Sequence, residues 1–174
     1  IETSILRFQP VLAKALKNKI PVRGYISCVA HCPYEGIIDP KNVSKIAKKL
    51  LEMGCYEISL GDTTGQGSAD QTKKILDECL KIMPPDKFAG HFHDTYQYAL
   101  DNIKICLEHG IKTFDSSVGG LGGCPYSPGS EGNVATEKVN KLLLSKGYDT
   151  GLNIEKINEC SKIALKLKTD GTYD

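Results

Sequence analysis

The sequence has no excess of charge of either sign and no long apolar run. Its 174 residues include 22 basic and 21 acidic side chains, for a formal net charge of +1. Without a basic field, the composition argues against nucleic-acid binding. No apolar stretch approaches the roughly 20 residues that a membrane-spanning helix needs, so we expect no membrane partner. The first residues resemble neither a secretory signal nor a transit peptide.

Zinc-type cysteine pairs and nucleotide-binding glycine motifs are also absent. The seven cysteines are an odd number and include no CxxC pair, and we infer a reducing compartment. Neither a GxGxxG turn nor a GKS/T phosphate loop is present, which disfavours nucleotide-phosphate binding. Four glycines within 119–123 instead suggest a lid or a close backbone approach. Four cysteines lie within apolar patterns and are expected in the core: Cys55, Cys79, Cys106 and Cys160.

Strand and helix patterns alternate along the chain. Four short β-type runs are expected at 22–27, 56–60, 88–93 and 111–116. Helical patterns with start and stop residues are expected near 4–18, 40–53, 69–83, 96–108, 136–145 and 154–167. The second of these helices begins with Asp39-Pro40, and the third follows a capping box formed by Ser68 and Gln71.

Repeated βα units predict a parallel sheet with right-handed crossovers. The repeat of about 30 residues is close to one-eighth of a ~250-residue (β/α)8 barrel. We therefore predict an α/β fold, with residues 1–174 as a single domain that forms half of a (β/α)8 TIM barrel. The alternative is a small doubly wound open sheet. The barrel is favoured because unusual polar residues end successive strands, and these strand ends form the active-site face of barrels.

The tripeptide His91-Phe92-His93 lies at the end of a predicted strand. Side chains alternate across a strand, so both imidazoles point to one face. Such a pair can bind a divalent metal, with Mn²⁺, Co²⁺ or Mg²⁺ favoured where oxygen ligands complete the shell. Two hydrogen-bonded histidines inside a barrel are the alternative, and the position at a strand end favours the metal.

Four other residues are candidates for chemistry, each with an ordinary alternative. Asn133 could offer an amide oxygen to the metal or occupy a turn. Cys124, before Pro125, could exchange a proton if its pKa is lowered, or be an incidental loop cysteine. Asp62 could act as a general base, support a histidine ligand or cap a turn. Glu137 lies in the first turn of a predicted helix, where a carboxylate suits the helix dipole.

Several motifs are distinctive in combination. They are VRGYISC at 22–28, GCYEISLGDT at 54–63, HFHDTY at 91–96, and DSS at 115–117 leading through GGCPY at 122–126 to Gly132-Asn133. Together they resemble the 3-hydroxy-3-methylglutaryl-CoA lyases over nearly the whole chain. The two histidines and the Gly-Asn pair are also similar to the wider metallolyase barrel superfamily, including isopropylmalate and homocitrate synthases. Those synthases lack the Gly-Gly-Cys-Pro-Tyr loop, so Cys124 separates the two groups.

The resemblance implies a barrel that cleaves 3-hydroxy-3-methylglutaryl-CoA to acetyl-CoA and acetoacetate by a metal-assisted retro-Claisen reaction, as in ketone-body formation and leucine degradation. It implies that His91, His93 and Asn133 bind a divalent metal ion, Mg²⁺ or Mn²⁺. It also implies that Cys124 transfers a proton and that Asp62, which matches a strand-end aspartate of the family, is catalytic. Residues expected to contact substrate, form the loop or support the ligands are Glu137, Gly122, Gly123, Ser59 and Tyr25.

The resemblance also implies partners and a compartment. We expect an acyl-CoA substrate and a homodimer, located in the mitochondrial matrix of a eukaryote, with a targeting peptide outside this chain, or in the cytoplasm of a bacterium. The family's first strand carries an Arg-Asp pair whose Asp binds the metal, and nothing here matches it. The chain therefore corresponds to about the last four βα units plus a C-terminal helix, with the N-terminal half absent. We expect these residues alone to bind metal weakly and to lack lyase activity.

Two other functions stay open from the sequence. One is an acetyl-CoA-condensing synthase of the same superfamily, of the isopropylmalate or homocitrate type. The other is a non-catalytic half-barrel that serves as an interaction module. The open sheet edges of such a module would favour dimerisation without a metal.

Overall fold

The central feature of the molecule is a curved, fully parallel sheet. The computed structural model describes residues 1–123 and 132–169. The sheet has the order β1-β4-β5-β6, from β1 (Arg23–Ile26), β4 (Glu57–Asp62), β5 (Phe88–Phe92) and β6 (Thr113–Asp115). Strands that neighbour each other in space therefore follow each other along the chain. A doubly wound sheet reverses its order at a switch point, and no reversal occurs within this sheet.

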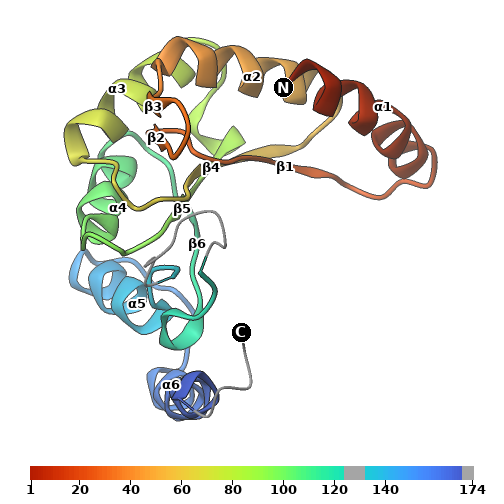
Figure 1. Cartoon of the computed structure of the whole chain (residues 1–174). Coiled ribbons are helices and arrows are strands. Elements are labelled where there is room, and N and C mark those ends of the chain that lie inside the picture. Colours follow the sequence, from red (N-terminus) through yellow and green to blue (C-terminus); the bar gives the residue numbers. More distant parts are fainter. Residues whose placement is uncertain (124–131, 170–174) are drawn as a thin grey trace.

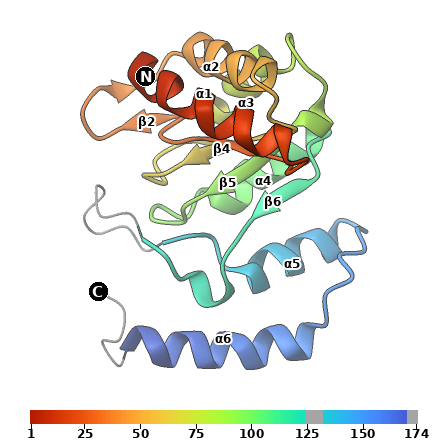
Figure 2. The ribbon, with the colours of Figure 1, turned by 90° about the vertical axis from the view of Figure 1, so that its right-hand side faces the viewer.

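Helices follow the outer side of the sheet (Figure 1). They are α1 (Glu2–Lys17), α2 (Pro40–Glu52), α3 (Ala69–Cys79), α4 (Ala99–Glu108), α5 (Thr136–Ser145) and α6 (Ile154–Thr169). Figure 1 shows the first five on the outside of an arc, with the strands inside it, and Figure 2 shows α6 beyond α5. A curved sheet with helices on one side is the arrangement of a barrel segment.

The starts of α2 and α3 confirm the predicted capping chemistry. The side chain of Asp39 accepts a hydrogen bond from the Lys41 amide at 2.9 Å, with Pro40 at the first helical position. At the start of α3, the Ser68 hydroxyl accepts from the Gln71 amide at 3.3 Å, and the Gln71 side chain accepts from the Ser68 amide at 2.9 Å. Both caps satisfy amide donors that the first helical turn leaves unpaired.

The segment after β1, for which no strand was predicted, forms a small hairpin. Strands β2 (His31–Cys32) and β3 (Gly36–Ile37) pair in antiparallel register. Short 3-10 turns also occur at η1 (Pro85–Lys87), before β5, and at η2 (Val118–Gly120), after β6. These short elements leave the predicted order of strands and helices unchanged.

The core lies between the outer side of the sheet and helices α2 to α4. Its fully buried members include Ile58, Phe88 and Ile103. The predicted burial of three cysteines is confirmed, and burial raises the pKa of the Cys79 and Cys106 thiols to about 12, which makes them poor nucleophiles. The expectation for Cys160 was wrong: it is exposed, because this position of α6 does not face the rest of the structure.

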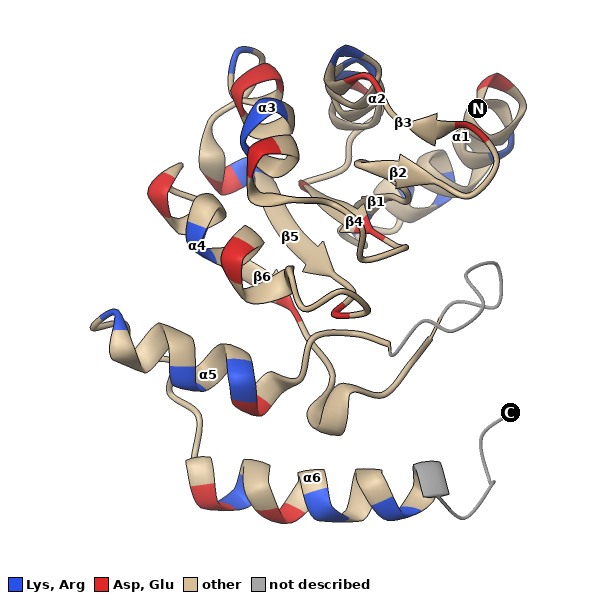
Figure 3. Ribbon diagram, turned by 60° about the vertical axis from the view of Figure 1, so that its left-hand side comes forward, with Lys and Arg blue, Asp and Glu red and all other residues tan. Residues whose placement is uncertain are grey.

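Charged residues of both signs are distributed along the helices (Figure 3). Lys73 and Asp77 pair at 2.8 Å on α3, and Lys156 and Glu159 pair at 3.0 Å on α6. Such exposed pairs contribute little to stability. None of the helices in the described part of the chain has the length and apolar character needed to cross a bilayer.

Candidate functional site

The inner face of the sheet, turned away from the helices, carries the first of the two predicted histidine ligands. In the parallel register, His91 on β5 lies between Gly61 on β4 and Asp115 on β6. Register partners point to the same side of a sheet, so these three residues share the inner face. Gly61 offers no side chain, whereas the Asp115 carboxylate reaches the imidazole, with 3.1 Å between His91 Nδ1 and Asp115 Oδ2. One nitrogen of the predicted metal ligand is therefore engaged by a carboxylate.

Asp115 is the centre of a hydrogen-bonded cluster on this face. The Arg23 Nη1 atom lies 2.7 Å from Asp115 Oδ1 and 3.0 Å from Oδ2, and the Ser59 hydroxyl donates to Oδ2 at 2.8 Å. Burial alone would raise the pKa of Asp115, but the hydrogen bonds from His91, Arg23 and Ser59 lower it to about 2. Asp115 is therefore an ionised acceptor at neutral pH.

Two residues expected near the site, Tyr25 and Ser59, belong to this cluster. Arg23 Nη1 donates to the Tyr25 hydroxyl at 2.6 Å, and the ring of Tyr25 meets that of His91 edge to face, with 6.2 Å between centroids. Sequence reasoning missed Arg23 and Asp115 as members of the site. No local signal marked them, because the register between the strands decides that they share a face with His91.

The second histidine lies beyond the end of β5, opposite Asn133. A bridge pairs His93 with Asn133, flanked by hydrogen bonds from the Asp94 amide to the Gly132 carbonyl and from the Val134 amide to the Phe92 carbonyl, both 3.0 Å. The rings of His91 and His93 lie 5.7 Å apart, centroid to centroid. The structure therefore brings Asn133 beside the two histidines predicted to bind metal with it, although Asn133 lies far from them in the sequence.

Burial lowers the pKa of His93, and the neighbouring His91 lowers it further. A neutral imidazole is the form that binds metal ions. The amide nitrogen of Asn133 donates to the carbonyls of Leu121 and Gly122, at 3.0 and 3.1 Å. These two bonds occupy the nitrogen of the amide and leave its oxygen as the atom that could bind a cation.

The glycine segment approaches Asn133 closely. Gly122 has a φ of +89°, and a Cβ atom at this position would lie 2.9 Å from the Asn133 amide nitrogen. A side chain here would be strained by the backbone conformation and would displace the amide of Asn133. Gly123 ends the described part of this segment and is exposed. The predicted loop cysteine, Cys124, lies outside the described residues.

Asp62 lies at the end of β4, but on the other face of the sheet. Its register partner is Phe92, a buried core residue, and its carboxylate accepts a hydrogen bond from the Gly67 amide at 2.9 Å. The loop that it holds packs on the segment after β5, since a Cβ at Gly65 would lie 2.9 Å from the His93 carbonyl oxygen. Burial raises the pKa of Asp62, while the bond from Gly67 opposes the shift. The structure does not bring this carboxylate into the Asp115 cluster.

Glu137 lies in the first turn of α5 and connects three segments. Its carboxylate accepts a hydrogen bond from the Gly119 amide at 3.2 Å and another from the Ser161 hydroxyl of α6 at 2.7 Å. Burial alone would raise the pKa of Glu137, but these bonds lower it. Its oxygens therefore hold the start of the glycine segment against α6, and no hydrogen bond of the described structure joins them to the histidines.

Within residues 1–123 and 132–169, no group of three or more His, Cys, Asp or Glu side chains is arranged to hold a metal ion. Two imidazoles and one amide oxygen are a partial ligand set. Divalent metals such as Mg²⁺ and Mn²⁺ prefer oxygen ligands, so further oxygen donors must complete it.

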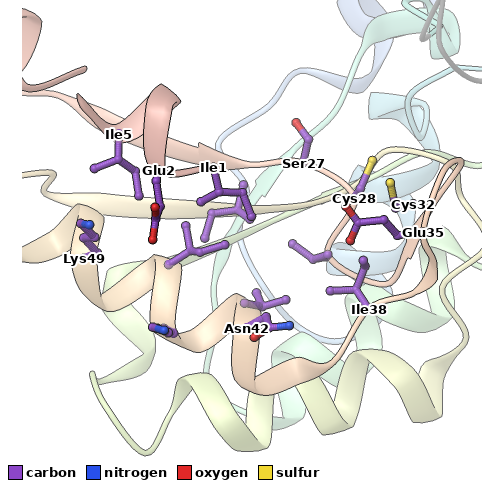
Figure 4. A pocket seen from close by; sticks show the side chains of 15 residues that line it. Ile1, Glu2, Ile5, Ser27, Cys28, Cys32, Glu35, Ile38, Asn42 and Lys49 are labelled. Atoms are coloured by element: carbon purple, nitrogen blue, oxygen red, sulfur yellow. The ribbon is translucent and has the colours of Figure 1, made fainter. Parts of the chain in front are cut away.

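A cavity of about 500 Å³ lies away from this cluster, between α1, α2 and the segment after β1 (Figure 4). Cys28 and Cys32 lie at one end of it, and Glu2 and Lys49 lie at the other. The predicted metal ligands are not part of its wall. The cavity therefore adds nothing to the argument for the metal site.

Comparison with known proteins gives consistent matches. A family model described as HMGL-like matches residues 7–164. The hydroxymethylglutaryl-CoA lyase of Pseudomonas mevalonii is 49% identical over 170 residues, which cover 97% of this chain and 56% of that protein. The names of further relatives include cytoplasmic and mitochondrial forms. The chain spans about half the length of the curated relatives that it matches.

Solved structures of HMG-CoA lyases also match this chain. The HMG-CoA lyase of Brucella melitensis matches with a TM-score of 0.94 and 44% identity, over 97% of this chain and 60% of that one. An HMG-CoA lyase of Acinetobacter baumannii, solved with coenzyme A and 3-methylmalate, matches with a TM-score of 0.88 and 30% identity, over 95% and 54%. These matches and the parallel sheet confirm the predicted α/β barrel fold. The relatives' names favour the lyase over the condensing synthase.

Proposed function

The chain belongs to the HMGL-like family, and on that premise we propose that residues 1–174 are the C-terminal part of a TIM-barrel lyase domain. The proposed reaction cleaves 3-hydroxy-3-methylglutaryl-CoA to acetyl-CoA and acetoacetate, a retro-Claisen step of leucine degradation and ketone-body formation. The observation that carries the proposal is the meeting of His91, His93 and Asn133 at the end of β5, at the strand ends where barrels bind substrates.

The three side chains fit a divalent metal ion, for which we propose Mg²⁺ or Mn²⁺. His91 is held through Nδ1 and has Nε2 available, and burial favours the neutral form of His93. Asn133 would contribute its amide oxygen, since its nitrogen is already bonded. When bound, the metal would act as a Lewis acid and a template for the hydroxyl and carboxylate oxygens of the substrate.

The reaction itself needs two proton transfers. The C3 hydroxyl must lose a proton as the C2–C3 bond breaks, and the carbon that becomes the methyl group of acetyl-CoA must gain one. We propose that the thiol of Cys124 gives the second proton, in keeping with the glycine–cysteine motif. For Asp62, the contacts favour a supporting role, because its carboxylate holds the loop that packs beside His93. Its participation as a general base stays a prediction.

The remaining candidates are assigned by their contacts. Tyr25 and Ser59 line the inner face beside His91, where a substrate bound to the metal would lie. Gly122 and Gly123 form the segment that continues to the cysteine. Glu137 positions the beginning of that segment rather than binding the metal.

The whole protein is proposed to be a homodimer that binds an acyl-CoA substrate. Its compartment would be the mitochondrial matrix in a eukaryote and the cytoplasm in a bacterium. Residues 1–174 by themselves would bind metal weakly and lack lyase activity, since the ligand set of the described residues is partial.

The test is a lyase assay of the gene product that contains this chain. Acetoacetate release from 3-hydroxy-3-methylglutaryl-CoA should require Mg²⁺ or Mn²⁺, and both His91→Ala and Cys124→Ala should depress it strongly. His109→Ala and Cys160→Ala are matched controls: His109 contacts Asp77 on the helix surface, and Cys160 is exposed on α6. Both controls should stay active. Thiol release from acetyl-CoA and a 2-oxo acid, without acetoacetate formation, would move the protein to the synthase group.

A further inference from the structure

Asp115 contacts His91 and is itself held from two other strands. Its Oδ2 atom meets His91 Nδ1 at 3.1 Å and the Ser59 hydroxyl at 2.8 Å, while its Oδ1 atom meets Arg23 at 2.7 Å. Arg23 is fixed in turn by Glu57, with 2.5 Å between Nε and Oε1. The carboxylate therefore has little freedom to turn away from the imidazole.

We propose that Asp115 is a positioning residue of the metal site, which fixes the tautomer and the ring orientation of His91. The inference rests on the proposed metal-binding function. An ionised carboxylate only accepts hydrogen bonds, so His91 must donate from Nδ1. The proton then sits on Nδ1 and the lone pair on Nε2, which is the nitrogen left to bind a metal. Carboxylates that orient histidine ligands in this way commonly change metal affinity about 10–100-fold when they are replaced.

Asp115→Asn should reverse this hydrogen bond. Arg23 needs an acceptor and lies closer to Oδ1, so the amide oxygen of the new side chain should face Arg23. The amide nitrogen would then take the place of Oδ2 and donate to His91 Nδ1. The imidazole proton would move to Nε2, where it blocks metal binding. The variant keeps the shape of the side chain, so its effect should come from the tautomer rather than from a cavity.

The experiment uses the gene product that contains this chain and Mn²⁺ as the probe. Electron paramagnetic resonance measures the concentration of free Mn²⁺ in the presence of each protein. The affinity for Mn²⁺ derived from it should be about 10–100-fold lower for Asp115→Asn than for the wild type. Asp77→Asn is the matched control, because Asp77 also contacts a histidine, His109, at 3.4 Å, but on the helix surface. The control should bind Mn²⁺ as the wild type does. Wild-type affinity in Asp115→Asn would overturn the proposal.

A second measurement needs no variant and no metal. The ¹⁵N spectrum of the metal-free wild type, in alkaline buffer, should show His91 protonated on Nδ1. A proton on Nε2 would overturn the proposal even if Asp115→Asn failed to fold. In a folded Asp115→Asn, the proton should appear on Nε2.

The outcomes separate this inference from the proposed lyase function. If the wild type binds Mn²⁺ and Asp115→Asn does not, but no acetoacetate is released, the lyase proposal fails and the role of Asp115 stands. If acetoacetate is released with Mn²⁺ while Asp115→Asn binds the metal normally, the lyase stands and the role of Asp115 fails. If the wild type binds no Mn²⁺, both fail.

Discussion

The two faces of the parallel sheet differ in chemistry although the same four strands supply both. On the inner face, Arg23, Ser59, His91 and Asp115 form a hydrogen-bonded cluster. On the outer face, alternate residues of the same strands are apolar and pack beneath the helices, as Phe88 does. The outer face therefore supplies the apolar core, and the inner face carries the polar groups of the proposed metal site.

Two aspartates at strand ends show how much this difference matters. Asp62 and Asp115 are the last residues of β4 and β6, yet they lie on opposite faces. Burial raises the pKa of Asp62, whereas hydrogen bonds from His91, Arg23 and Ser59 lower that of Asp115 to about 2, against its burial. The face on which a carboxylate lies, and not its place at a strand end, decides its chemistry.

The largest effect is expected on the inner face. His93→Ala removes a proposed metal ligand, so acetoacetate release by the gene product should fall on the order of 10³-fold, which corresponds to about 4 kcal/mol. His109→Ala, at the end of α4, should retain nearly full activity. Steady-state kinetics at saturating Mn²⁺ measures both. Activity of His93→Ala within a few-fold of the wild type would remove this residue from the site.

On the outer face, a core substitution should act on stability instead. Phe88→Ala leaves a cavity beneath the helices and should lower the free energy of unfolding by about 3–5 kcal/mol. Tyr56→Ala, at a half-exposed position, should lower it by about 0.5 kcal/mol or less. Urea unfolding of the gene product measures both changes. Equal losses at the two positions would contradict the assignment of the core to the outer face.

The two aspartates should give pH dependences of opposite sign. The folded pKa of Asp115 is lowered, so the stability it contributes is present above its unfolded pKa and disappears as pH falls toward about 2. Asp115→Asn should therefore be less stable than the wild type at neutral pH, and the gap should close in acid.

The folded pKa of Asp62 is raised, so its charged form opposes folding above that pKa and ceases to do so as pH falls. Asp62→Asn, which keeps an acceptor for Gly67, should be more stable than the wild type at neutral pH, and this difference in stability should disappear in acid. Thermal unfolding of both variants across acidic and neutral pH checks the two signs. Differences that change in the same direction for both variants would contradict the comparison.

The smallest effect is expected on the helix surface, outside both faces. Lys156 pairs with Glu159 on α6, and both side chains are exposed. Lys156→Ala should change the free energy of unfolding by about 0.5 kcal/mol or less and leave acetoacetate release unchanged. A larger loss would mean that α6 carries an interaction that this exposed pair does not account for.

Much of the fold could be predicted from the sequence, because its signals are local. The caps at Asp39 and Ser68 and the alternation of strands and helices follow from short patterns. The hairpin of β2 and β3 could not be predicted, since two-residue strands are too short to show an alternation. The exposure of Cys160 was missed because an apolar pattern on a helix does not tell which part of its surface finds a partner.

Site residues that are close together in the sequence could be predicted. Residues that different strands bring together could not. His91 and His93 could be placed together from the sequence because they are two residues apart at the end of one predicted strand, and the structure puts His93 just beyond the end of β5. Asp115 joins them only through the register of β5 with β6, and Arg23 only through contacts that cross the sheet. Asp62 could be located at a strand end, but its face depends on the register with Phe92.

The central claim is that a divalent metal binds on the inner face at the end of β5. The most direct measurement is an anomalous-difference map from crystals of the gene product grown with Mn²⁺. The account predicts one strong peak in contact with His91 Nε2, His93 and the amide oxygen of Asn133. A peak at other residues, with these three side chains free of metal, would contradict it.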